Sequence, residues 1–385
     1  MSLQLALIVL GIATIFVVVM FSYAKQRGYL FNSLISSRVP VTFLHLLKTW
    51  VALPKKNVSG GLKSALISAI DFRLDPDPTK STKTLEDKQP RRPINLRQHR
   101  AYTSKANKEY QRILKSDYWA RLSGSELAQS HDVLAIYRTH EVDLIHPHRI
   151  HGLIYPGNQW IDLEDSTPSD RFYDLIVSAQ IVDRNGPINE SELTRTNNLV
   201  YELSERFNRK LQFDMTMEGA LDEAKLLDKF CQQYDVLVIF NIVASKDQQF
   251  LGKDLHRLAT ISNMTVDDMG LFRLLEPESS EIWFTMANQF EPGFFPSSKL
   301  EEFATTGLFL FMNLPLVSRP IEALDKMYST AKLMSLELSG TIKTLDGADI
   351  DTNEIDKIRQ QIIEIADVFH RVGILPGSEV ALRLF

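Results

Sequence analysis

Residues 279–315 read SSEIWFTMANQFEPGFFPSSKLEEFATTGLFLFMNLP, and this stretch decides how the fold is interpreted. Two runs rich in aromatic and aliphatic residues, 282–290 and 307–314, flank a loop that contains proline, glycine and serine. Apolar runs of this length between such residues are typical of β-strands. The stretch therefore predicts two strands joined by a loop.

The second of these strands would carry apolar side chains on both faces. Because side chains alternate along a strand, Phe309, Phe311 and Asn313 share one face and the residues between them share the other. Two arrangements remain open. Either helices cover one face and the other presents Phe309 and Phe311 outward as a binding surface, or the sheet is buried on both sides.

Charged residues divide the 385-residue chain into parts of opposite sign. Residues 1–23 carry none, residues 24–130 carry 20 Lys and Arg against 8 Asp and Glu, and residues 131–385 carry a net charge of −17. A basic part beside an acidic part indicates separate roles, with the basic part near an anionic surface such as lipid head groups or nucleic acid.

The uncharged part, residues 1–23, is predicted to be a membrane anchor. Residues 3–23 match the ~20 apolar residues that span a bilayer. They lack the basic start and shorter apolar core of a cleaved signal peptide. Lys25, Arg27 and Arg38 follow, which places that side in the cytoplasm and the N-terminus outside. The sequence predicts a single-pass anchor for a cytoplasmic body.

Residues 24–130 are interpreted as a basic linker that is largely disordered. Residues 74–93 are polar, contain prolines and have few large apolar residues, a composition typical of disorder. Residues 41–53 are apolar but too short to span a bilayer, so they form either an interfacial helix or a small packing element. Attraction to anionic lipid explains the basic excess better than nucleic-acid binding, because aromatic residues are not interleaved with the basic ones.

Alternating strands and helices are expected from residue 131 onward. Residues 131–233 form an α/β region of unassigned role. The order strand, turn, helix, strand at 173–215 recurs at 308–345, either as a second copy of one split βαβ unit or by chance. Residues 234–385 form the last predicted domain. Its expected elements are strands at 234–244, 266–275 and 341–345, and helices at 251–263, 318–340 and from 351.

No constellation of catalytic residues is present in the sequence. The chain has no glycine-rich phosphate loop, paired-histidine zinc helix or nucleophile elbow. His146, His148 and His151 lie in a proline-containing segment without a further ligand nearby, so no metal site is predicted. The single cysteine, Cys231, excludes an internal disulfide. We therefore expect neither an enzyme nor a cofactor.

Motifs within residues 234–385 resemble the ZipA family, which tethers the tubulin-like division protein FtsZ to the bacterial inner membrane. These motifs are F-x-x-A-N at 284–288, Pro-Gly at 292–293, and G-x-x-x-F-M-x-x-P at 307–315. The anchor matches only in kind. Residues 131–233 and 373–385 have no counterpart in the family domain.

The resemblance implies an antiparallel six-stranded sheet with three helices on one face and the other face partly open. We therefore expect an α+β chain: a single N-terminal transmembrane helix, a linker, and a split β-α-β antiparallel sheet with helices packed on one face. In the family, the C-terminal peptide of FtsZ lies in an apolar groove on the open face. Carried over to this sequence, the groove consists of Leu237, Ile239, Met269, Leu271, Ala287, Gln289, Phe309 and Phe311.

Three residues depart from the family pattern. Gln289 stands where an apolar Met is expected, Phe309 is bulkier than the usual small residue, and Glu291 replaces a residue that is often basic. All three would change the shape or the charge of the groove.

The sequence thus predicts a cell-division adaptor in the bacterial inner membrane, at the septum, whose cytoplasmic domain binds FtsZ. The alternative is a membrane-tethered RNA-binding or other interaction domain that uses the same aromatic face. The net charge of −17 over residues 131–385 argues against RNA, because phosphate binding needs a positive face. No nucleic-acid partner is expected.

Overall fold

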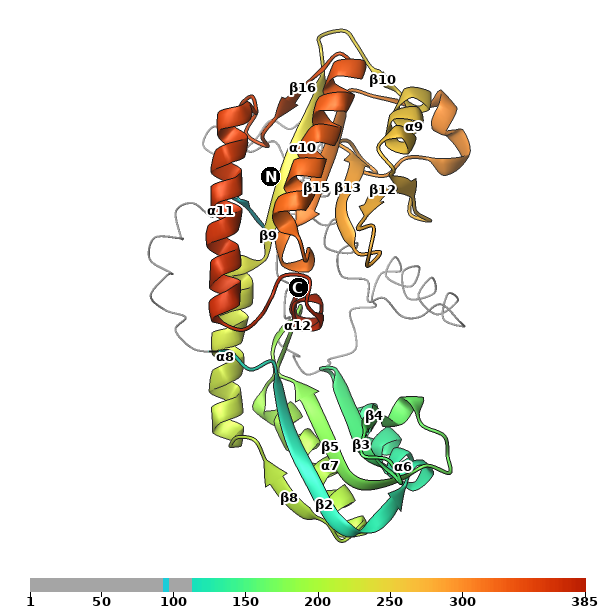
Figure 1. The fold of residues 1–385 in the computed structure, drawn as a ribbon, viewed down its shortest axis with the longest axis vertical. Coiled ribbons are helices and arrows are strands. Elements are labelled where there is room, and N and C mark those ends of the chain that lie inside the picture. Colours follow the sequence, from blue (N-terminus) through green and yellow to red (C-terminus); the bar gives the residue numbers. More distant parts are fainter. Residues whose placement is uncertain (1–92, 97–112) are drawn as a thin grey trace, which may run out of the picture.

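The computed structural model describes residues 93–96 and 113–385. They form two lobes, each built on one sheet, and helix α8 (Met217–Tyr234) passes from one lobe to the other (Figure 1). The predicted anchor and most of the predicted linker lie outside the described residues. Among the residues that are described, no helix is both long and apolar enough to cross a membrane.

The C-terminal lobe consists of residues 235–371 and the short strand at 94–95, and it contains a seven-stranded sheet with β9 and β15 at its centre. The strands lie in the order β1, β9, β15, β13, β12, β11. Strand β15 pairs with one edge of β9, and β1 and β16 both pair with its other edge. All pairings are antiparallel except that of β1 with β9. The bounds are β1 (Ile94–Asn95), β9 (Val236–Ala244), β11 (Thr265–Val266), β12 (Phe272–Leu275), β13 (Ile282–Asn288), β15 (Gly307–Asn313) and β16 (Gly340–Lys343).

Helices cover one face of this sheet. Helix α10 (Pro320–Glu337) packs on β9, β13, β15 and β16, and α11 (Thr352–Arg371) packs on α10. Leu308, Leu310 and Met312 of β15 join the main core with the inner side of α10. This confirms the α+β class and the predicted alternation along 307–314. The remaining elements of the lobe are α9 (Gly252–Ile261), the β10 (Phe250–Leu251) and β14 (Ala304–Thr305) pair, and the 3-10 helices η3 (Ser297–Glu302) and η4 (Leu314–Leu316).

The N-terminal lobe, residues 113–216, contains an antiparallel five-stranded sheet in the order β4, β3, β5, β2, β8. Helices α6 and α7 cover one face and enclose a second core. The bounds are β2 (Asp117–Gln129), α6 (Ser130–Glu141), β3 (His148–Tyr155), β4 (Trp160–Asp162), η2 (Leu163–Asp165), β5 (Arg171–Gln180), β6 (Val182–Asp183), β7 (Gly186–Pro187), α7 (Glu190–Arg206) and β8 (Lys210–Phe213).

Strand β2 lies inside residues 24–130, which the sequence analysis assigns to the linker. The assignment is wrong for residues 113–130, so the folded part begins earlier than predicted. The strand reads DYWARLSGSELAQ, and its register shifts between Ser123 and Ala128. This irregularity breaks the alternation of apolar residues by which a strand is recognised.

The two sheets share a connectivity. In the N-terminal lobe β5, α7 and β8 follow one another, and β5 and β8 pair with opposite edges of β2. In the C-terminal lobe β15, α10 and β16 follow one another, and β15 and β16 pair with opposite edges of β9. These are the segments whose order of elements recurs in the sequence.

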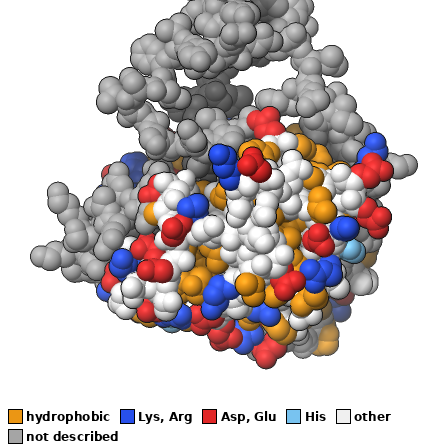
Figure 2. All heavy atoms as spheres, turned by 90° about the horizontal axis from the view of Figure 1, so that it is seen from above, with side chains coloured by type: hydrophobic (Ala, Val, Ile, Leu, Met, Phe, Trp, Pro, Cys, Tyr) orange, Lys and Arg blue, Asp and Glu red, His pale blue; other side chains and the backbone are white. Residues whose placement is uncertain are grey.

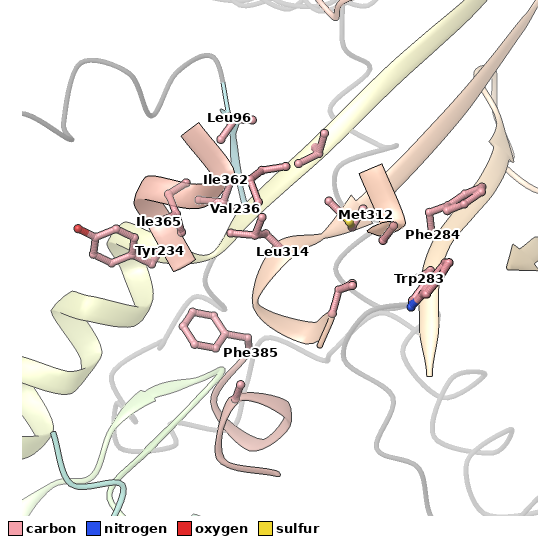
Figure 3. Close-up of a cluster of buried hydrophobic side chains, with 14 of the residues drawn as sticks. Leu96, Tyr234, Val236, Trp283, Phe284, Met312, Leu314, Ile362, Ile365 and Phe385 are labelled. Atoms are coloured by element: carbon pink, nitrogen blue, oxygen red, sulfur yellow. The ribbon is translucent and has the colours of Figure 1, made fainter. Parts of the chain in front are cut away.

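One hydrophobic core joins the lobes. It includes Tyr118 of β2, Phe230 of α8 and Phe369 of α11. The terminal helix α12 (Glu379–Leu384) completes it: the Phe385 ring centroid lies 5.6 Å from that of Phe369 and 6.3 Å from that of Phe230. Figure 3 shows Phe385 in one cluster with side chains from other elements. Residues 373–385, which lack a family counterpart, thus hold the two lobes together.

Candidate functional site

Strands β9, β15 and β13 organise the face of the C-terminal sheet that no helix of the described residues covers, here called its helix-free face. Phe309 lies opposite Asn241 on β9 and Ala287 on β13, and Phe311 lies opposite Ile239 on β9. Opposite residues of paired strands point to the same face and lie within contact distance. Five of the eight predicted groove residues come together here in a cluster separate from the main core. We call it the apolar cluster: Leu237, Leu271, Ala287, Phe309 and Phe311.

The apolar cluster is buried, which corrects the prediction of an exposed face. None of its side chains is more than 5% exposed, and every residue of β15 is buried. Of the two arrangements left open by the sequence, the one with both faces of β15 buried is observed. Lateral packing contributes at one position, because the large Phe309 ring lies opposite the small Ala287 and shields it.

The other three predicted groove residues lie at the margin and are half-buried. Ile239 packs against the apolar cluster. Met269 is not on a strand, because the Asp267 carboxylate accepts hydrogen bonds from the backbone N–H groups of Met269 and Leu271, both 2.9 Å long. This turn interrupts the predicted strand 266–275. Gln289 follows β13, and its carboxamide lies so close over Gly307 that a side chain at 307 would fit only if Gln289 moved.

Two asparagines lie on this face. The sequence placed Asn313 beside Phe309 and Phe311 but not Asn241, and it assigned a role to neither. Asn241 lies opposite Phe309, and Asn313 lies opposite Leu237. Both are 8% exposed. The Asn241 Oδ1 atom and both polar side-chain atoms of Asn313 are buried without a hydrogen-bond partner.

The helix-free face of the N-terminal sheet has a different composition. Tyr155, Trp160 and Tyr173 are 36–38% exposed there. The Arg171 guanidinium lies 5.0 Å from the Tyr155 ring centroid, and that of Arg121 lies 5.8 Å from the Trp160 ring centroid. We call these five residues the aromatic–arginine face. Arg121 also forms an ion pair of 2.6 Å with Asp174.

Histidines 146 and 148 make hydrogen bonds inside the N-terminal lobe. His146 Nδ1 lies 2.8 Å from a Glu192 carboxylate oxygen, and His146 Nε2 lies 3.1 Å from the Gly186 carbonyl oxygen. Both partners offer acceptor oxygens, an arrangement that favours the charged ring, in which both nitrogens donate. Burial opposes this charge, but the hydrogen bond to Glu192 and the charge of Asp183 outweigh it and raise the pKa of His146 above its usual 6.5. Burial lowers the pKa of His148.

His146 and His148 therefore have hydrogen-bond partners within the fold. His148 Nε2 lies 2.8 Å from the Thr196 hydroxyl, and His151 is on β3, half-buried. Within residues 93–96 and 113–385, no group of three or more His, Cys, Asp or Glu side chains is arranged to hold a metal ion. Cys231 is buried in α8.

Residues 236–361, from the start of β9 into α11, match the family model described as "ZipA, C-terminal FtsZ-binding domain". The predicted resemblance to ZipA is confirmed. Proteins named Cell division protein ZipA are 30% identical over 132 residues in Pseudomonas aeruginosa and 32% identical over 143 residues in Ectopseudomonas mendocina. These alignments cover 34% and 37% of this chain, and 46% and 52% of the relatives.

The chain therefore spans about half the length of the curated ZipA relatives it matches. The residues that match the family model include the whole apolar cluster. The N-terminal lobe and α12 lie outside it.

Proposed function

We propose that this chain is an adaptor that binds the C-terminal peptide of FtsZ on the apolar cluster and holds it at the cytoplasmic membrane at the division septum. The observation that carries the proposal is the position of the cluster. It lies on the helix-free face of the sheet, within the residues that match a family of FtsZ-binding domains.

The chemistry of the cluster suits a peptide ligand. A peptide that binds through a few apolar side chains needs a surface without charges, and the five members of the cluster are aliphatic or aromatic. None of them can donate or accept a proton in a reaction. This composition supports an adaptor rather than an enzyme.

Access to the cluster limits the affinity. Because its side chains are buried, the peptide binds only to molecules in which they have become accessible. The apparent affinity is then lowered by the fraction of molecules in that state. We expect a weak interaction with a single peptide.

Membrane attachment compensates for weak binding. In this proposal residues 3–23 span the inner membrane once, with the N-terminus outside, and residues 24–112 attract anionic lipid. Adaptors on one membrane face FtsZ filaments that carry many copies of the peptide. Multivalent contact of this kind raises avidity without any new contact in the site.

RNA binding by the same face is not supported. Phosphate binding needs a positive face, and the cluster contains no Lys or Arg. Figure 2 shows acidic and basic side chains interspersed on the described part of one end of the molecule, without a patch of one sign.

The proposal is tested by titrating the full chain, in lipid nanodiscs, with a fluorescent peptide from the C-terminus of FtsZ. Saturable binding that Phe311→Ala weakens at least fivefold, about 1 kcal/mol, is the expected result. Ile176→Ala, a half-buried residue of the helix-free face of the other sheet, is the matched control and should leave binding unchanged. Absence of binding at millimolar peptide, with the wild-type chain folded, would refute the proposal.

A further inference from the structure

Two buried side-chain amides without partners lie on an otherwise apolar face. Asn241 and Asn313 are both more than nine-tenths buried, and three of their four polar side-chain atoms have neither solvent nor a hydrogen-bond partner. Buried polar groups in folded proteins are nearly always paired, so such atoms call for an explanation. Asn288, nearby on β13, shows the usual arrangement: it donates to the Phe290 carbonyl at 2.8 Å and accepts from Thr305 at 2.7 Å.

The strand register places both amides beside the apolar cluster. Asn313 lies opposite Leu237, and Asn241 lies opposite Phe309. Along β9 these two levels are four residues apart, a distance of about 13 Å. Ile239 and Phe311 lie between them. The two carboxamides therefore stand at opposite ends of the central part of the cluster.

A carboxamide offers one donor group and one acceptor, the complement of a main-chain peptide unit. A helical peptide would leave them unpaired, because its own N–H and C=O groups bond to each other. An extended segment has free main-chain groups, and about four of its residues cover 13 Å.

We infer that Asn241 and Asn313 bind the main chain of a non-helical segment of the partner peptide. This rests on the proposed function, and it adds how the peptide is held. The apolar side chains of the peptide contact the cluster, and the two amides fix its position along β9. Asn241 Oδ1 accepts a main-chain N–H, and Asn313 can both accept and donate.

The test replaces each amide by an apolar side chain of similar size in the full chain. Asn241→Leu and Asn313→Leu should each weaken peptide binding about tenfold, a change of about 1.4 kcal/mol. Removal of an unpaired buried amide should leave the melting temperature unchanged or raise it. A purely structural role predicts the opposite, a lower melting temperature with unchanged affinity. Asn158→Leu, in an exposed turn, is the matched control.

A second measurement identifies the partner group. Peptides in which single main-chain N–H groups are replaced by ester oxygen are titrated against the wild type and Asn241→Leu. One ester should weaken binding to the wild type about tenfold and have no further effect on the variant. Full-strength peptide binding by both leucine variants would refute this inference and leave the proposed function intact, whereas no binding by the wild type would refute the proposed function.

Discussion

The helix-free faces of the two lobes differ although the sheets behind them share a connectivity. The C-terminal face carries the apolar cluster, with no member more than 5% exposed, whereas the N-terminal face carries three aromatic rings that are 36–38% exposed beside two arginines. The shared order of strands and helices fixes which face the helices cover. The side chains decide what the other face can do, so one ligand would not bind both.

The largest expected effect on stability comes from removing α12, the C-terminal helix that packs between the two lobes. Deleting residues 378–385 removes the buried side chains of Leu384 and Phe385 and should lower the free energy of unfolding by at least about 5 kcal/mol. Hydrogen exchange followed by mass spectrometry should then show the lobes opening separately. The point variant Leu382→Ala, at an exposed position of the same helix, should change stability by less than about 0.5 kcal/mol. Joint opening of both lobes in the deletion variant would contradict a holding role for α12.

Replacing an aromatic residue by alanine should lower the free energy of unfolding by different amounts on the two faces. Phe309→Ala empties a buried site and should lower the free energy of unfolding by about 3–5 kcal/mol. Tyr173→Ala removes a ring that is 37% exposed and should cost less than about 1 kcal/mol. Urea unfolding monitored by circular dichroism measures both. Equal costs would mean that the faces differ in sequence but not in packing.

Sequence alone predicted the central strands, and it failed where tertiary contacts decide. Strands β9 and β15 are predominantly apolar, so their positions and the shared face of Phe309 and Phe311 could be read directly. The burial of that face could not be predicted. Alternation shows which residues share a side of the strand, but it does not show what packs against that side. Met269 was misplaced because the carboxylate of Asp267 binds the backbone of its own turn. The N-terminal boundary was missed because β2 contains a register shift.

Stability should decrease as the pH rises above about 6.5, because the folded protein favours the charged form of His146. The pKa of His146 is raised by Glu192 and Asp183, so above pH 6.5 the folded state holds a proton that the unfolded chain has lost. The slope for one proton is at most about 1.4 kcal/mol per pH unit. This pH dependence ends once the pH has risen past the pKa of His146 in the folded protein.

Chemical unfolding of the wild type and His146→Gln between pH 6.5 and 8.5 measures this effect. The difference in stability between them should shrink with rising pH. His148 affects stability in a different pH range. Burial lowers its pKa in the folded protein, so it reduces stability only as the pH falls below 6.5. A difference that grows with pH would show that His146 is neutral in the folded protein.

The smallest effect is expected on the aromatic–arginine face. Arg121→Ala breaks the ion pair with Asp174 and the contact with Trp160, but the arginine side chain is 44% exposed. Exposed ion pairs contribute about 0–1 kcal/mol, so thermal unfolding should shift by only a few degrees. A large loss of stability would show that these residues support the N-terminal lobe and are not free to contact a partner.

Strand β1 gives the molecule a defined point of mechanical loading. Its two residues pair in parallel with Val236 and Leu237, so residues 93–96 reach β9 where the apolar cluster begins. If residues before 93 are pulled, the tension is applied first to this short pairing and only then to the N-terminal lobe. A pairing of two residues is the first contact to yield under such a pull. Under such a pull, strand β9, which carries Leu237 and Ile239, bears the load before the N-terminal lobe does.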